Sequence, residues 1–156
     1  MNFRVIPISS KLAEETRETL FSPQYKSLKA DVSVANGYGP CRSCLRVFKQ
    51  GEDERIYLTY NAFEGRSTLP DPGPIFIHRN RCREHSGGEF PPDLLALPLL
   101  LESFGPESLL LKREAMNALT VSDQIGRILA DGEVRFINLR NTEAGCFVAR
   151  VERVER

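Results

Sequence analysis

The C-terminal end of the chain carries the pattern that most restricts the fold. Two β-rich runs, EVRFINL at 133–139 and CFVARVERV at 146–154, are separated by the six residues 140–145. A parallel crossover needs about a dozen residues or more, whereas a short loop can join two antiparallel strands. The two runs are therefore predicted to pair as an antiparallel hairpin, and the domain must contain an antiparallel ladder.

The rest of the chain shows short β-rich runs and amphipathic helices without a regular βαβ repeat. Further strands are predicted at 2–8, 28–34, 55–60, 75–78 and 107–114. Helices are predicted at 9–20, capped by Ser9 or Ser10, just after Pro92, and at 120–132, capped by Thr120 or Ser122. These elements predict a single α+β domain over residues 1–156, with a mostly antiparallel sheet of about six or seven strands and two or three helices.

Two connecting segments and the orientation of the short helix after Pro92 are also predicted. Residues 64–74 hold three prolines and two glycines and are predicted to be a surface loop. Residues 41–48 are predicted to be a strand or irregular extended chain. The short helix after Pro92 is expected to turn Leu94, Leu95 and Leu97 inward.

Composition and charge argue against several classes of partner. Acidic and basic residues balance at 21 each, and a protein that binds polyanions is usually basic, so nucleic acid and anionic membranes are not expected. The N-terminus lacks the apolar core of a signal peptide, and the longest apolar stretch is interrupted by Pro98. We expect a cytoplasmic protein whose partner is another protein or a small molecule, and whose cysteines are free thiols, metal ligands or redox groups.

The cysteines and histidines are concentrated in two short segments. The first holds Cys41 and Cys44, and 33 residues later the second holds His78, Cys82 and His85. Zinc favours four thiolate or imidazole ligands in a tetrahedron, and two such pairs from distant segments can supply them. We therefore predict a Cys3His zinc site formed by Cys41, Cys44, His78 and Cys82, with His85 as the substitute for His78.

Several arginines lie beside these residues. Three thiolates and one zinc ion leave a net negative charge, which neighbouring guanidinium groups can offset while donating hydrogen bonds to sulfur. The candidates are Arg42, Arg46, Arg79, Arg81 and Arg83. Alternation would also place Arg79, Arg81 and Arg83 on one side of an extended segment, where they could bind a phosphate or a carboxylate, but an exposed charged loop is the favoured explanation.

Two other interpretations of the thiols remain open. Cysteine often packs as a small hydrophobic residue, and this is the expected state of Cys146. Alternatively, Cys82 between two arginines is a candidate nucleophile or redox sensor, and the Cys41/Cys44 pair could cycle as a disulfide. Against this, the helical context of thioredoxin-type pairs is missing, and a cysteine–histidine dyad has no obvious orienting group. The acidic run 52–54 is interpreted as a solvated turn.

Three segments resemble a family of small bacterial proteins known as domain of unknown function 1203. They are GPCRSCLRVFKQGEDERIYLTYNAF at 39–63, GPIFIHRNRC at 73–82 and NLRNTEAGCFVARVERV at 138–154. The resemblance implies no reaction, substrate or partner. One group of the family looks like this sequence, with a cysteine pair in the first motif and a histidine followed four residues later by a cysteine in the second.

The resemblance also bears on the thiols. The matching positions here are Cys41, Cys44, His78 and Cys82, whereas His85 lies outside the motif and Ser43 stands where related chains can carry a histidine. A divergent group of the family has a single cysteine in the first motif and lacks the later pair, which implies that the fold itself does not require a metal.

These observations lead to a hypothesis with two alternatives. We expect a non-catalytic, zinc-stabilised binding or accessory protein. The first alternative is a thiol-dependent enzyme or redox sensor that uses Cys82 or the Cys41/Cys44 pair. The second is an interaction domain without a site at these residues. The sequence alone leaves open whether the protein is an enzyme.

Overall fold

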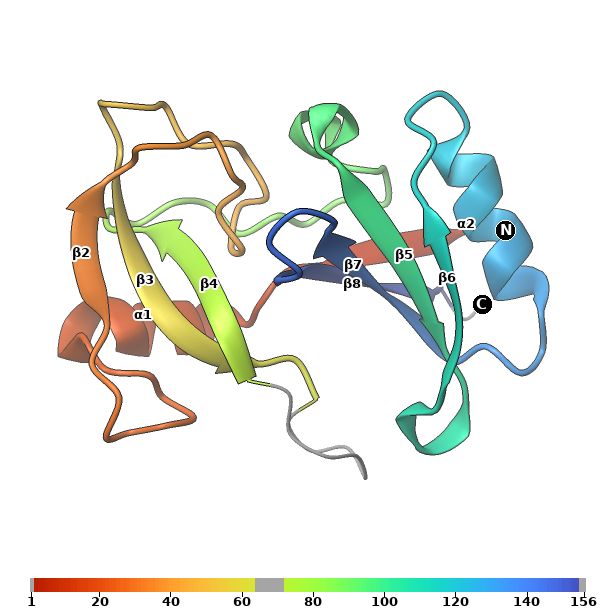
Figure 1. Ribbon diagram of the computed structural model, residues 1–156, viewed down its shortest axis with the longest axis horizontal. Coiled ribbons are helices and arrows are strands. Elements are labelled where there is room, and N and C mark those ends of the chain that lie inside the picture. The colour runs from red at the N-terminus through yellow and green to blue at the C-terminus, as the bar shows by residue number, and fades with distance from the viewer. Residues whose placement is uncertain (1, 64–71, 155–156) are drawn as a thin grey trace.

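The fold consists of two antiparallel sheets, each packed against one α-helix (Figure 1). It was obtained as a computed structural model, which describes residues 2–63 and 72–154. In chain order the described elements are β1 (Phe3–Ile6), α1 (Ser10–Thr19), β2 (Asp31–Val34), β3 (Glu54–Asn61), β4 (Pro72–His78), the 3-10 helix η1 (Pro92–Ala96), β5 (Leu99–Phe104), the 3-10 helix η2 (Pro106–Ser108), β6 (Leu110–Ala115), α2 (Val121–Ala130), β7 (Phe136–Asn141) and β8 (Phe147–Arg153).

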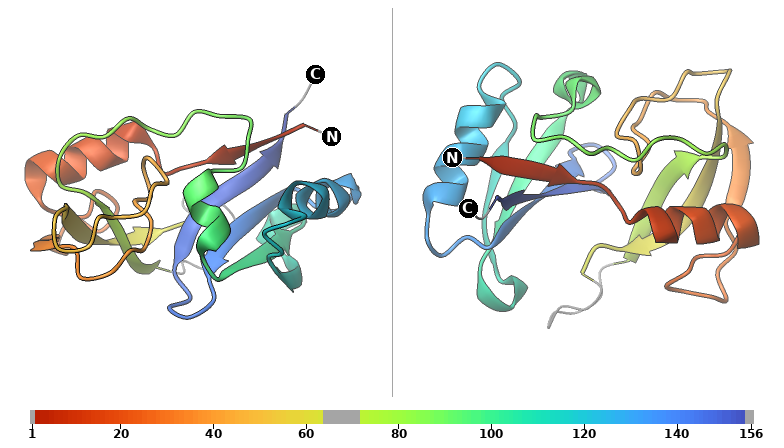
Figure 2. Two further views of the ribbon diagram at one scale, coloured as in Figure 1. Left: turned by 90° about the horizontal axis from the view of Figure 1, so that it is seen from above. Right: turned by 180° about the vertical axis from the view of Figure 1, so that it is seen from behind.

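The larger sheet has five strands in the order β1-β8-β7-β5-β6, and every neighbouring pair is antiparallel. The hairpin of β7 and β8 that the sequence predicts is confirmed, with Ile137 opposite Val151. The N-terminal strand β1 pairs with β8, so the first and last described strands lie side by side (Figure 2). The two ends of the described chain therefore belong to the same sheet.

The smaller sheet has the order β2-β3-β4, and α1 lies across its back (Figure 2, right). Ser9 caps α1 by accepting a hydrogen bond from the backbone N–H of Leu12, as expected. The antiparallel pairing of β3 with β4 sets Arg55 opposite His78. The residues just before β3 therefore lie beside the residues that end β4.

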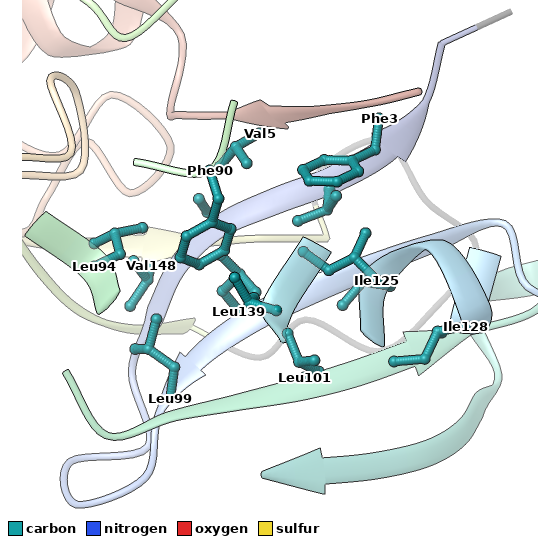
Figure 3. Packing of buried hydrophobic residues seen from close by; sticks show 14 of the residues in the cluster. Phe3, Val5, Phe90, Leu94, Leu99, Leu101, Ile125, Ile128, Leu139 and Val148 are labelled. Atoms are coloured by element: carbon teal, nitrogen blue, oxygen red, sulfur yellow. The ribbon is translucent and has the colours of Figure 1, made fainter. Parts of the chain in front are cut away.

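Two clusters of buried side chains hold these layers together. In the first, the apolar face of α2 packs on the five-stranded sheet together with Phe90 and Leu94 (Figure 3). The second lies between α1 and the three-stranded sheet and also takes Phe104, Phe136 and Phe147 from the five-stranded sheet. Both sheets thus share this second core.

The predicted α+β class and antiparallel pairing are confirmed, with differences in detail. The described residues form eight strands because β5, which the sequence did not suggest, inserts between β6 and β7. The strand predicted at 107–114 begins later, at Leu110, after the turn of η2. Residues 72–74, predicted as loop, already belong to β4, and the rest of that predicted loop, 64–71, lies outside the described residues.

Two smaller expectations about the helices are wrong. Leu94 and Leu97 are buried, but Leu95 is exposed, because η1 is a single short 3-10 segment that can bury only one side. The side chain of Thr120 precedes α2 but accepts no capping hydrogen bond. No helix in residues 2–63 and 72–154 is long and apolar enough to cross a membrane.

Candidate metal centre

The first half of the site is a tight turn between Pro40 and Val47, which form an isolated β-bridge. The backbone N–H of Cys41 donates to the carbonyl of Arg46 at 2.9 Å, and that of Leu45 donates to the carbonyl of Cys41 at 2.8 Å. This segment was predicted as extended chain. The turn instead brings the two cysteines of the motif to the same side, as two ligands of one metal ion require.

Leu45 holds this turn against the rest of the molecule. Its φ of 59° is in the left-handed region, which costs a branched side chain roughly 1–2 kcal/mol. Its side chain is buried in the core of the five-stranded sheet, whereas Cys41 and Cys44 belong to the core of the three-stranded sheet. Burial of the Leu45 side chain offsets the cost of its left-handed backbone conformation. Because Leu45 lies in one core and the two cysteines lie in the other, the turn connects the two cores.

The second half of the site is the end of β4 and the segment that follows it. The backbone N–H of Arg42 donates to the carbonyl of Phe76 at 3.0 Å, which places the turn directly over β4. The N–H of His85 donates to the carbonyl of Ser43 at 3.0 Å and keeps the segment after β4 against the same turn. His78 and Cys82 are therefore carried to the two cysteines of the turn.

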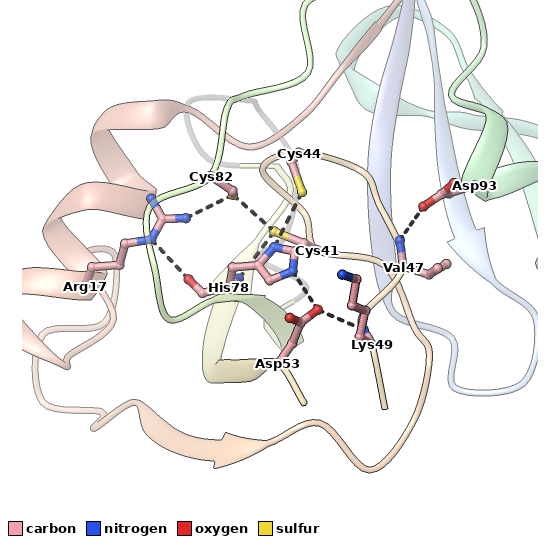
Figure 4. Close-up of polar contacts among 9 residues, drawn as sticks. All are labelled: Arg17, Cys41, Cys44, Val47, Lys49, Asp53, His78, Cys82 and Asp93. Atoms are coloured by element: carbon pink, nitrogen blue, oxygen red, sulfur yellow. Dashed lines mark hydrogen bonds and ion pairs between the residues drawn. The ribbon is translucent and has the colours of Figure 1, made fainter. Parts of the chain in front are cut away.

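The four predicted ligands converge, as Figure 4 shows. The Sγ atoms of Cys41 and Cys82 are 3.8 Å apart, and the Sγ of Cys44 is 3.5 Å from the Nδ1 of His78. All four ligand atoms lie within 4.8 Å of one another. Cys41 and Cys44 are buried, while His78 and Cys82 are partly exposed.

These separations can be compared with those of a zinc tetrahedron. Two sulfurs bound at about 2.3 Å and separated by a tetrahedral angle of about 109° lie about 3.8 Å apart. For one sulfur and one nitrogen bound at about 2.0–2.1 Å, the separation is about 3.5 Å. The Cys41–Cys82 distance of 3.8 Å and the Cys44–His78 distance of 3.5 Å have these values. Two opposite edges of the cluster therefore have the lengths expected for a Cys3His tetrahedron, and the other four separations are within 4.8 Å.

The close approach of the four groups changes their protonation. The hydrogen bond between Cys41 and Cys44 lowers the pKa of Cys41 and raises that of Cys44. Hydrogen bonds first with Cys41 and then with Cys82 raise the pKa of His78 to about 10. These shifts favour the thiolate form of Cys41 and the protonated form of His78, and a metal that takes all four ligands must displace the protons that remain on them.

Asp53 orients the imidazole of His78. Its Oδ2 lies 3.3 Å from the Nε2 of His78 and also accepts the backbone N–H of Lys49 at 2.8 Å (Figure 4). That backbone N–H, followed by His78, holds the pKa of Asp53 below its usual value. A carboxylate on Nε2 leaves Nδ1 free to face the sulfurs, which is the arrangement that supports histidine ligands of metals. The sequence suggested only a solvated acidic turn here.

Arg17 of α1 is the second residue that the sequence did not reveal. Its Nε donates to the carbonyl of His78 at 3.1 Å, and its Nη2 donates to the Sγ of Cys82 at 3.4 Å (Figure 4). One guanidinium therefore spans both residues of the second segment. It supplies the positive charge and the hydrogen bond to sulfur that were predicted for arginines nearer in sequence.

Of the predicted arginines, Arg46, Arg81 and Arg83 line the same pocket as Cys44, His78 and Cys82. Arg42 is buried and directs its guanidinium to the carbonyls of Pro40 and Phe147 and to the Sγ of Cys146, so it donates to a thiol outside the cluster. Arg81 is exposed and pairs with Glu14 at 3.1 Å. The remaining three lie at the surface, partly or fully exposed: Arg46, Arg79 and Arg83.

The structure also separates His85 and Cys146 from the cluster. The Nε2 of His85 is buried without a hydrogen-bond partner among the described residues, and burial lowers the pKa of this histidine. His85 is not among the side chains that meet at the site. Cys146 precedes β8 and is partly buried, with the guanidinium of Arg42 3.1 Å from its Sγ.

A pocket of about 410 Å³ opens beside the cluster. Three of the four convergent side chains line it, namely Cys44, His78 and Cys82, while the buried Cys41 does not. The site therefore has one accessible side and one side that faces the core.

Two antiparallel sheets and a Cys3His cluster where the turn meets the end of β4 define an α+β protein with a candidate metal site. The model of the family described as "Protein of unknown function (DUF1203)" matches residues 38–153, and the chain belongs to that family. All four convergent side chains lie within the matched region, whereas Arg17 precedes it. No curated protein and no solved structure matches the chain.

Proposed function

We propose that the chain binds one zinc ion through Cys41, Cys44, His78 and Cys82, and that the ion stabilises a non-catalytic binding or accessory domain. The observation that carries the proposal is the pair of separations, 3.8 Å between two sulfurs and 3.5 Å between sulfur and nitrogen, which match the edges of a zinc tetrahedron. Thiolate and imidazole ligands in this geometry favour zinc over magnesium or calcium, which prefer oxygen.

The ligand count supports a structural role for the metal. A catalytic zinc keeps a position open for water or substrate, whereas four protein ligands close the shell. The ion would join the turn at 40–47, whose Leu45 is buried in the core of the five-stranded sheet, to the end of β4, which lies in the core of the three-stranded sheet. It would therefore stabilise the contact between the two sheets, and the partner of the domain would be a protein or a small molecule.

The test is the metal content of protein purified without an affinity tag, measured together with the reactivity of its thiols. We expect about one zinc per chain, and three thiols that react only after denaturation or chelation. Protein that refolds with its native secondary structure, binds no zinc and exposes all its thiols to a thiol reagent would contradict the proposal.

A second candidate is a thiol-dependent enzyme, because Cys44, His78 and Asp53 form a line of nucleophile, base and orienting carboxylate. This arrangement provides the orienting group that the sequence seemed to lack. Two observations favour the metal instead. The pKa of Cys44 is raised, which opposes its use as a nucleophile, and two further sulfurs occupy the same site. Protein without metal but with one fast-reacting thiol at Cys44 would favour the enzyme.

Replacing Asp53 tests the support of the histidine ligand. In Asp53→Asn the carboxylate on Nε2 is lost, so His78 becomes a weaker and less ordered ligand, and we expect zinc affinity to fall about 10–100-fold. The affinity is measured by competition with a chromogenic chelator. Glu52→Gln is the matched control, because Glu52 is exposed and adjacent in sequence. Equal affinity in both variants would contradict the orienting role of Asp53.

Replacing Arg17 tests the support of Cys82. Arg17→Ala removes the hydrogen bond to Sγ and the one to the carbonyl of His78, and we expect a loss of zinc affinity of about 10–100-fold in the same competition assay. Arg81→Ala removes an arginine next to Cys82 that pairs only with Glu14 in the described structure, and it should leave the affinity unchanged. A larger effect from Arg81 than from Arg17 would count against this assignment.

A further inference from the structure

The Cys41–Cys82 pair has the geometry of an oxidation-sensitive switch. We propose that a peroxide converts these two thiolates to a disulfide and thereby releases the zinc ion, a step that rests on the proposed function because it regulates the same site. Three features of the cluster suit it to this step: the distance between the two sulfurs, their unequal exposure, and the irregular backbone that carries Cys82.

The two sulfurs are already close to bonding distance. Their separation of 3.8 Å must shorten by about 1.8 Å to reach the S–S bond length of about 2.05 Å. Cys41 is fixed in the turn by its backbone hydrogen bonds to Arg46 and Leu45. Cys82 lies in the segment 81–87, which has no regular secondary structure, so the movement can come from its side.

The two sulfurs differ in access, which assigns their roles. Cys82 is partly exposed and lines the 410 Å³ pocket, so a small oxidant reaches it from solvent. Cys41 is fully buried and lies outside the lining of that pocket. Cys82 is therefore the thiolate that is oxidised first, and Cys41 is the resolving thiolate.

The chemistry balances with a peroxide as the oxidant. The Cys82 thiolate attacks one oxygen of hydrogen peroxide, the O–O bond breaks, and Cys82 becomes a sulfenic acid while hydroxide leaves. The Cys41 thiolate then attacks the Cys82 sulfur, an S–S bond forms, and a second hydroxide leaves. The sulfurs lose two electrons and the peroxide gains two. Only Cys44 and His78, half of the proposed ligands, would then remain to hold zinc, so the ion would be released.

The experiment treats the zinc-loaded, full-length chain with equimolar hydrogen peroxide and follows both products. Released zinc is measured with a chromogenic indicator, and the disulfide is mapped after free thiols are alkylated. Trypsin cleaves after Arg42, so Cys41 and Cys44 fall on different peptides and their disulfides with Cys82 are distinguishable. We expect one zinc released per chain, a Cys41–Cys82 disulfide, and recovery of the zinc site after dithiothreitol and zinc are added.

Two variants support the assignment of the two thiols. Cys146→Ser removes the cysteine outside the cluster and should leave zinc release and the disulfide unchanged. Cys41→Ser removes the resolving thiol, so peroxide should drive Cys82 on to a sulfinic acid without a disulfide. Because that variant can fail to fold, the disulfide map of the wild-type chain decides the outcome.

The outcomes separate the two proposals. Purified chain without zinc before peroxide is added overturns both the zinc site and the switch. Zinc bound beforehand, combined with a Cys41–Cys44 disulfide, a sulfinic acid at Cys82 or no change at any thiol, overturns the switch alone and leaves the structural zinc site in place.

Discussion

Removal of zinc with a strong chelator will lower the free energy of unfolding by about 4 kcal/mol or more. This is the linkage contribution of a ligand present at about 1,000 times its dissociation constant, and structural zinc sites often bind more tightly. In a chain of this length 1 kcal/mol corresponds to about 2–4 °C. The midpoint of thermal unfolding should therefore fall by about 10 °C, measured by circular dichroism with and without the chelator.

Cysteine variants attribute this loss to the cluster. Cys44→Ser should unfold at the low midpoint of the chelated protein and should no longer respond to the chelator. Cys146→Ser should keep the response, because Cys146 lies outside the group of convergent ligands. An equal midpoint for the wild-type chain with and without the chelator would contradict a structural role for the metal.

The sequence predicted the elements that have a clear local signal. The β7–β8 hairpin follows from two β-rich runs and the short loop between them, although most residues of both strands are buried. Helix α2 follows from an apolar stripe that ends near Gly132. One face of α2 is buried and the other faces solvent, so burial leaves its period in the sequence.

Strand β5 was missed because it lacks this contrast. Five of its six residues are buried, among them Glu102, so polar and apolar positions do not alternate. Glu102 tolerates burial because Arg113 and Arg140 each bond to its carboxylate, at 2.8 and 2.7 Å. A continuous apolar run after Pro98 does not distinguish a central strand from a buried helix. The order of the strands and their division between two sheets depend on pairings such as β1 with β8, which leave no local signal.

The residues of the candidate site likewise divide into those that the sequence predicts and those that it does not. The four convergent side chains were predictable because cysteine and histidine are rare here and their spacings suit a metal. Asp53 and Arg17 were not predictable, because any surface acid or arginine has the same local appearance. Asp53 reaches His78 only through the register of β3 against β4, and Arg17 reaches Cys82 only because α1 packs beside that segment.

Replacing Arg42 will have the second large effect, this time on the contact between the two sheets. Its guanidinium is buried and donates to the carbonyl of Phe147 at 2.7 Å, to the carbonyl of Pro40 at 2.6 Å and to the Sγ of Cys146 at 3.1 Å. Arg42→Met keeps most of the volume but leaves two carbonyls without this donor. At about 1–3 kcal/mol for each buried group, we expect the free energy of unfolding to fall by about 3 kcal/mol.

The substitution also removes the cost of burying a charged guanidinium, and this effect alone would raise the free energy of unfolding. Replacing a buried charge by a hydrophobic residue can stabilise a protein when the partners are replaced as well, but here both carbonyls belong to the backbone and remain. The cost of leaving the two carbonyls without a donor should therefore exceed the gain from no longer burying a charge. Arg42→Lys should also destabilise, because a single ammonium cannot match the planar fork that reaches three acceptors.

Arg46→Met is the matched control, because Arg46 lies in the same turn but is exposed. The free energy of unfolding of this variant should stay within about 0.5 kcal/mol of the wild-type value. The measurement is denaturant unfolding of zinc-loaded protein, with zinc content checked in each variant. A stable Arg42→Met variant that retains its zinc would show that the side chain of Arg42 is not needed to hold the turn to the five-stranded sheet, whose core also takes the side chain of Leu45. A loss of stability at full zinc occupancy would instead assign to Arg42 a contribution to the sheet contact that is independent of the metal.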